Sequence, residues 1–187
     1  MNHVRHRRAL LGAWVSVLVL ATLWAEPVRA DPADDALATR VKAAFLFNFV
    51  KFTIWPQGKF TSPSAPIVLC VLEPDPFGET LEKTIADKNV NGRPLLLYRS
   101  NRAADLLGCH LAYLGASDVG TLPAALKQLT GHSILLVHEN TQALPNGGIR
   151  FMTSDRYIRF EVNLTAIENE SLQLSSKLLA LSSVVRQ

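Results

Sequence analysis

The stretch DPADDALATRVKAAFLFNFVKFTIWP, residues 31–56, is the most strongly apolar part of the chain after its first thirty residues. Asp31 before Pro32 is typical of a helix start, with a capping carboxylate and a proline at the first helical position, and Pro56 is a stop signal. Apolar residues recur at helical spacing on two faces: Leu37, Val41, Phe45, Phe49 and Phe52 on one, and Leu46, Val50 and Ile54 on the other. The stretch therefore predicts a helix that is buried within the fold.

The first thirty residues have the pattern of a secretory signal peptide. A basic start, MNHVRHRR, precedes an apolar run at residues 9–24, and Val28-Arg29-Ala30 is typical of a cleavage site. The run is shorter than the about 20 residues that a membrane-spanning helix needs, and an uncleaved anchor is the alternative. We therefore predict a cleaved signal peptide at residues 1–30 and a single domain at residues 31–187.

The formal net charge of +3 comes from the predicted signal peptide, which holds four arginines and one glutamate. Residues 31–187 are electroneutral, so their composition gives no reason to expect nucleic acid or an anionic membrane as a partner. The sequence contains no motif of serine hydrolases, nucleotide-binding loops, zinc peptidases or EF-hands, and its histidines follow no metal-ligand spacing. We predict a protein that is not an enzyme and that needs no cofactor or metal.

Alternating strand and helix patterns follow the first helix. Apolar runs predict strands at residues 67–72, 95–98, 109–114 and 134–137, with helices at 76–85, 101–107 and 122–129 between them. Two further strands, 149–153 and 157–163, are close enough for a hairpin, and a leucine-rich stretch at 171–184 predicts a last helix. These patterns predict an α/β fold: a mostly parallel sheet of about six strands flanked by helices, with a C-terminal antiparallel hairpin.

Two cysteines, Cys70 and Cys109, are present, both after the predicted signal peptide. In an oxidising compartment an even pair suggests one disulfide, and two buried free thiols are the alternative. Cys70 lies late in its predicted strand and Cys109 begins its own. Parallel neighbours in even register would hold them too far apart, so we expect either an offset register or a third strand that is not a simple parallel neighbour.

Ligands of open α/β sheets bind beyond the carboxyl ends of the strands. The polar groups that the sequence places in those loops are Asp75, Ser117, Asp118, Glu139 and Asn140. They are candidates for a small-molecule site, although helix caps and turns use the same residue types.

Several blocks of sequence resemble one known family. VKAAFLFNFVKFTIWP at residues 41–56 is one block, and GGIRF, RFEVNL and LQLSSKLL follow in order between residues 147 and 179. CVLEPDPFGETL after the first strand and CHLAYLG at the third complete the pattern. Over essentially all of residues 31–187, the chain is similar to the YfiR family of small periplasmic regulators.

The resemblance implies a non-catalytic periplasmic repressor that holds the periplasmic sensor domain of an inner-membrane diguanylate cyclase inactive. Release, through an outer-membrane lipoprotein partner or redox damage, would raise cyclic di-GMP and favour biofilm formation. Cys70 and Cys109 match one family cysteine pair, whereas the second, redox-exposed pair of some members has no counterpart at residues 142–151. Dimers are common in the family.

Three residues near the C-terminus, Ile149, Glu161 and Ile167, are candidates for a partner-binding patch. Alternation along residues 157–163 puts Phe160 in the core and Glu161 on the other face, where it could meet a partner or pair with Arg159 or Arg150. Ile167 follows in a polar stretch without an obvious apolar stripe. The alternative is a solvated face with ordinary core isoleucines.

A second function remains open at this stage. A periplasmic small-ligand-binding protein that reports to a membrane kinase or transporter fits the same sequence.

Overall fold

The predicted first helix is present as α1 (Pro32–Lys51) in a computed structural model that describes residues 32–115, 121–139, 145–154 and 157–185. Ala43, Leu46, Phe49 and Val50 are fully buried, as expected of a core helix. The helix ends earlier than predicted, because the next residues form the short strand β1 (Thr53–Ile54), which pairs with β9 (Gln173–Leu174). Ile54 is consequently 61% exposed and lies outside the core.

Eight strands form one sheet in the order β10-β8-β7-β6-β5-β2-β4-β3. They are β2 (Ile67–Leu72), β3 (Asn89–Val90), β4 (Arg93–Ser100), β5 (Leu111–Leu114), β6 (Leu135–His138), β7 (Ile149–Ser154), β8 (Tyr157–Asn163) and β10 (Ser183–Val185). Pairing is antiparallel at β7/β8 and β3/β4 and parallel at the other junctions. The α/β class is confirmed, but the sheet is mixed and wider than expected, so the prediction of a mostly parallel sheet of about six strands holds only in part.

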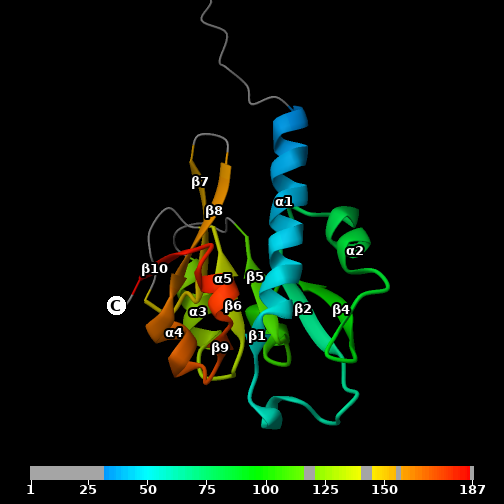
Figure 1. Cartoon of the computed structure of the whole chain (residues 1–187), viewed down its shortest axis with the longest axis vertical. Helices are drawn as coiled ribbons and strands as arrows, with labels where there is room; N and C mark the ends of the chain where they lie inside the picture. The colour runs from blue at the N-terminus through cyan, green and yellow to red at the C-terminus, as the bar shows by residue number, and fades with distance from the viewer. Residues whose placement is uncertain (1–31, 116–120, 140–144, 155–156, 186–187) are drawn as a thin grey trace, which may run out of the picture. The chain divides into compact units, whose positions relative to one another are not determined.

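Helices cover both faces of the sheet. One buried cluster joins α1 and α2 (Glu79–Ile85), which lie side by side in Figure 1, to residues of the strands such as Leu69 and Leu111. The other joins α3 (Leu122–Leu129) and the 3-10 helix η2 (Ala103–Leu106) to alternate strand residues such as Cys70 and Ala112. Among the described residues, no helix combines the length and apolarity needed to span a bilayer.

Four phenylalanines connect α1 to the predicted hairpin. Phe49 lies with its ring centroid 4.9 Å from that of Phe160 in β8 and 5.5 Å from that of Phe151 in β7, and Phe45 is 5.2 Å from Phe160. Fully burying each such ring contributes about 1.5–3 kcal/mol. Helix α1 therefore packs against the C-terminal hairpin. The prediction that Phe160 is a core residue is confirmed.

The predicted helix at residues 171–184 is wrong. The structure has α4 (Leu164–Asn169), β9, a single turn α5 (Ser176–Leu179) and β10 in this region. Ser171 adopts a positive φ of 56°, which interrupts any helix. After Ser171 the main chain forms strand pairs with other elements: β9 pairs with β1, and β10 pairs with β8. The leucines are buried or exposed according to these pairings, not to a helical stripe.

A disulfide joins Cys70 to Cys109, whose Cα atoms are 6.0 Å apart. β5 is a simple parallel neighbour of β2 and places Ala112, not Cys109, opposite Cys70. Cys109 lies before β5, in a turn where its N–H donates to the carbonyl oxygen of Leu106 at 3.0 Å. This turn carries Cys109 to the sheet face on which Cys70 lies. The predicted strand at residues 109–114 therefore begins two residues too early, and neither expected alternative for the strand pairing is needed.

Candidate functional site

Charged and hydroxyl side chains gather where the parallel strands end. Asp75 follows β2, Arg99 is near the end of β4, Tyr113 lies in β5 and Glu139 directly follows β6. Because these four strands are parallel neighbours, their carboxyl ends meet at one edge of the sheet. Two of the residues that the sequence nominated for a ligand site, Asp75 and Glu139, are thus at the edge where they were expected.

Glu139 is the centre of a hydrogen-bonded group below α1. Its Oε1 accepts a short hydrogen bond from the Tyr113 hydroxyl, and its Oε2 is 2.6 Å from Nζ of Lys42 in α1. Tyr113 is 1% exposed, and the Lys42 and Glu139 side chains are 17% and 19% exposed. Burial, followed by the charge of Glu139, raises the pKa of Tyr113 far above its ordinary value. Tyr113 therefore stays a protonated donor at neutral pH.

Arg99 ties α2 to the end of β4. Its Nε donates to Asp75 at 2.7 Å, its Nη1 to Glu82 at 2.6 Å and its Nη2 to the carbonyl oxygen of Gly78 at 2.8 Å. The other Asp75 oxygen accepts the N–H of Phe77 at 2.7 Å. The hydrogen bond to Asp75 is the main reason that the pKa of Arg99 is raised. Both oxygens of Asp75 are thus used in holding the loop before α2.

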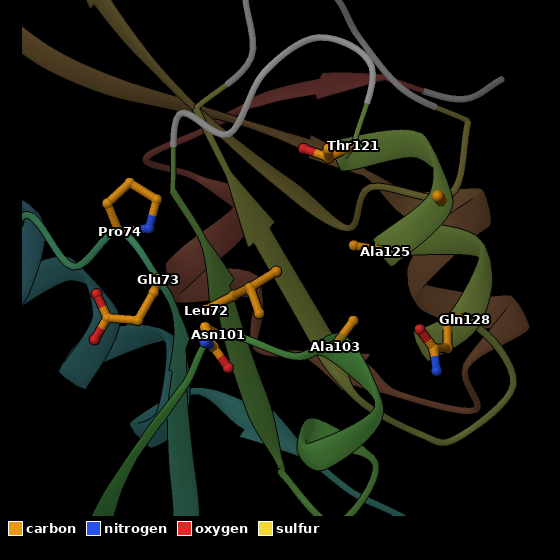
Figure 2. A pocket seen from close by; sticks show the side chains of 9 residues that line it. Leu72, Glu73, Pro74, Asn101, Ala103, Thr121, Ala125 and Gln128 are labelled. Carbon is orange, nitrogen blue, oxygen red and sulfur yellow. The ribbon is translucent and has the colours of Figure 1, made fainter.

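The other residues nominated for a ligand site, Ser117, Asp118 and Asn140, lie outside the described residues. A pocket of about 450 Å³ opens beside the same edge, between the end of β2, η2 and α3. Figure 2 shows its lining, with Leu72, Ala103 and Ala125 as apolar groups and Asn101 and Gln128 as polar ones. Glu73, Pro74 and Asn101 directly follow β2 and β4 at this edge, but Asp75 and Glu139 do not line the pocket.

The nominated partner-binding patch does not form a surface. Ile149 is fully buried and Ile167 is 2% exposed, both in the cluster below α1. Glu161 accepts from Nε and Nη2 of Arg150 on the neighbouring strand, at 2.9 and 2.6 Å. The prediction of a partner-binding patch is therefore wrong for the two isoleucines, because β7 and α4 direct them into the core. The expected pairing of Glu161 with Arg150 is present.

Two buried histidines are further features of the fold. His110 lies between the rings of Trp55 and Phe60 and accepts from the main-chain N–H of Val68 at 3.1 Å through Nδ1. Its Nε2 has no hydrogen-bond partner among the described residues. Burial, with smaller contributions from nearby cations, lowers the pKa of His110 and that of His138 to about 4. Both imidazoles are neutral near pH 7.

Sequence reasoning missed Lys42, Tyr113 and Arg99 as members of this polar group. The available signals were weak: a lysine that opens the mostly apolar stretch KAAFLFNFVK, and a tyrosine in the buried strand LAYL. A partner 97 residues away along the chain, as for Lys42 and Glu139, leaves no local pattern. The packing of α1 over the strand ends brings Lys42 to Glu139 and Tyr113, and the packing of α2 brings Glu82 to Arg99.

The geometry favours a structural role for this polar group. Its carboxylates accept from Lys42, Tyr113 and Arg99, and the tyrosine is held protonated. Within the described ranges, no three His, Cys, Asp or Glu side chains are grouped so that they could hold a metal ion. The fold and the site together define a disulfide-linked α/β protein whose polar side chains at this edge of the sheet bind one another.

The comparison with family models agrees with the sequence. The model of the YfiR/HmsC-like family matches residues 39–183, from within α1 to the first residue of β10. The chain belongs to this family, which confirms the resemblance noted in its sequence blocks.

Proposed function

We propose that this protein is a periplasmic regulator that binds and represses the periplasmic sensor domain of an inner-membrane diguanylate cyclase. Through that contact it controls cyclic di-GMP and biofilm formation. The observation that carries the proposal is the match of residues 39–183 to the YfiR/HmsC-like family. The leader pattern at residues 1–30 supports export, and a disulfide suits an oxidising compartment.

Repression of this kind works by differential binding. A partner with active and inactive conformations is shifted toward the conformation that the repressor binds more tightly. Such a repressor needs no turnover. In this chain the carboxylates of Glu139 and Asp75 accept hydrogen bonds from Lys42, Tyr113 and Arg99 and so have a structural role. Capture of the repressor by an outer-membrane lipoprotein would release the cyclase.

Deletion of the gene tests the proposal. We expect cyclic di-GMP and biofilm mass to rise in the deletion strain and to return to the parental level when the gene is restored. An active-site-dead version of the regulated cyclase should abolish the rise. An unchanged cyclic di-GMP level in the deletion strain would count against the proposal.

The pocket beside β2 favours a second candidate function, a small-ligand-binding protein that reports to a membrane kinase or transporter. Its volume of about 450 Å³ and its mixed apolar and polar lining suit a small organic molecule. A thermal-shift screen with nucleotides and aromatic metabolites tests this, because a ligand at 100 times its Kd stabilises by about 2.7 kcal/mol. Ala125→Trp, which would fill the pocket, should abolish any shift.

A further inference from the structure

The side of α1 that faces away from the core carries a narrow row of residues. They recur at helical spacing on one side of the helix: Leu37, Arg40, Ala44, Phe47 and Lys51. Leu37 is 53% exposed, and Arg40, Ala44 and Lys51 are also exposed, whereas Phe47 is partly buried. We call these five residues the α1 stripe.

The cations of the α1 stripe have no carboxylate partner among the described residues. Side chains on a helix pair at i±3 and i±4, and within α1 those positions around Arg40 and Lys51 hold only Ala, Leu, Phe and Asn. Residues 36–51 contain no Asp or Glu at all. The ion pairs that the described structure contains include neither side chain. The stripe is therefore a basic face.

A third cation borders the α1 stripe. Nζ of Lys88 lies 4.3 Å from the ring centroid of Phe47, and Lys88 is exposed and also belongs to none of the described ion pairs. Residues 31–187 as a whole are electroneutral, so this face is a local excess of positive charge beside the exposed Leu37. Complementary charge favours an acidic partner with apolar side chains.

The spacing and the charge of the stripe indicate what kind of partner fits it. Residues three and four apart along a helix form the row against which another helix packs. A second copy of the stripe would bring more cations and no acid, and like charges oppose such a contact. A helix that lies in a membrane surface needs a broad apolar face, and α1 turns its broad apolar face toward the sheet. An acidic amphipathic helix satisfies both requirements.

We propose that the α1 stripe binds an acidic amphipathic helix of the sensor domain that this protein represses. Carboxylates of that helix pair with Arg40 and Lys51, and an apolar side chain packs on Ala44, whose short side chain lets the two helices approach closely. Arg40 and Lys51 are 11 residues apart, or about 16 Å along the axis, close to three full turns. One face of a partner helix can therefore reach both. The proposal rests on the proposed function, which supplies the sensor domain.

Charge reversal in the deletion strain tests the stripe. The Arg40→Glu/Lys51→Glu chain should fail to restore repression, so that cyclic di-GMP stays at the level of the deletion strain. The matched control is Lys127→Glu/Arg159→Glu, which makes the same change of net charge at exposed residues of α3 and β8. With equal amounts of each chain in the periplasm, the control should restore the parental level.

The wild-type chain separates this proposal from the proposed function. If the wild-type chain and the reversed stripe lower cyclic di-GMP equally, the stripe proposal is overturned and repression stands. If the control pair fails together with the reversed stripe, net charge governs binding and the stripe proposal is again overturned. A wild-type chain without effect would count against the proposed function and against the stripe with it.

A neutral pair of substitutions excludes misfolding as the cause. Arg40→Gln/Lys51→Gln removes both charges and keeps good helix formers at exposed positions, so the Tm of the purified chain should not change. Loss of repression at an unchanged Tm supports the stripe. Full repression by the neutral pair would overturn it.

Ala44→Gln tests close packing without a change of charge. Residue 44 is exposed and glutamine is a good helix former, so the fold should persist, but the longer side chain should hold the partner helix away and abolish repression. Ala180→Gln, at an exposed residue after α5, is the control and should repress normally. Normal repression by Ala44→Gln would overturn the proposed helix contact.

Vesicle cosedimentation tests a membrane surface as the alternative occupant. The probe is a vesicle of phosphatidylethanolamine and phosphatidylglycerol, mixed with the purified exported chain. We expect the chain to stay in the supernatant. Sedimentation with the vesicles that Arg40→Glu/Lys51→Glu abolishes would overturn a helix as the occupant of the stripe.

Discussion

Glu139 accepts hydrogen bonds from two elements that are distant in the sequence, α1 through Lys42 and β5 through Tyr113. Removing its charge leaves the partly buried Lys42 cation without its carboxylate. We expect Glu139→Gln to lower the free energy of unfolding by about 2 kcal/mol, as for hydrogen bonds to charged groups. Urea unfolding measures this.

The exposed pair of Glu79 and Lys83 is the matched control for Glu139, with side chains 78% and 76% exposed. Glu79→Gln should leave the urea midpoint unchanged, since exposed ion pairs contribute little. Equal effects of the two substitutions would show that the Glu139 group does not stabilise the fold.

His110 should make stability depend on pH. Its folded pKa of about 4 lies below the ordinary value of about 6.5, because burial and the charges of Lys59 and Arg93 oppose protonation. Between these values the unfolded chain binds more protons, so this contribution is complete above pH 6.5 and is lost as the pH falls toward 4. We expect the His110→Gln variant to lose less stability than the wild type between pH 7 and pH 5, measured by urea unfolding.

The His132→Gln variant is the control, because His132 is exposed, and it should match the wild type. Identical pH dependence in all three proteins would contradict this account.

At the scale of elements, Gly147 sets how closely the chain before β7 passes β6. A Cβ at this position would overlap the imidazole of His138. We expect Gly147→Ala to cost about 1–3 kcal/mol, as for overpacking in a core. Gly58→Ala is the control, because a Cβ there has nothing within 4 Å. Thermal unfolding of both variants checks the difference, and an unaltered Tm for Gly147→Ala would show that the contact relaxes without cost.

The disulfide links β2 to the turn before β5 across a sequence separation of 39 residues. In the chain-entropy description, a loop of this length contributes about 4 kcal/mol. Replacing both Cys70 and Cys109 with alanine should lower the free energy of unfolding by about that amount in the absence of reductant. Adding reductant to the wild-type chain should reproduce the loss. A change below about 1 kcal/mol would indicate that the covalent link constrains the unfolded chain very little.

The spacing of apolar residues along the chain correctly predicted those elements that bury one regular apolar face. α1, β2, α3 and the hairpin of β7 and β8 follow apolar spacing that the structure buries for the most part, with Leu37 and Ile54 of the first stretch exposed at 53% and 61%. The C-terminal segment was mispredicted because its leucines fit a helix equally well, and only the open edges of β1 and β8 decide between the two conformations. Lys42 and Tyr113 escaped prediction for a related reason, since their partner Glu139 becomes a neighbour only after folding.

At the scale of the whole molecule, the chain combines an α/β core, one disulfide and an edge strand that remains open among the described residues. Its family match covers residues 39–183, from within α1 to the start of β10. The proposed regulator would act by binding, for which a supported framework matters more than reactive side chains.

The central claim is repression from the periplasm, and cyclic di-GMP measured in a deletion strain under two complementations tests it most directly. One plasmid carries the whole chain, and the other carries the chain starting at Asp31, which lacks the predicted leader and stays in the cytoplasm. We predict that the whole chain restores the low cyclic di-GMP level and that the leaderless chain, present in equal amount, does not. Restoration by both chains, or no rise on deletion, would contradict the account.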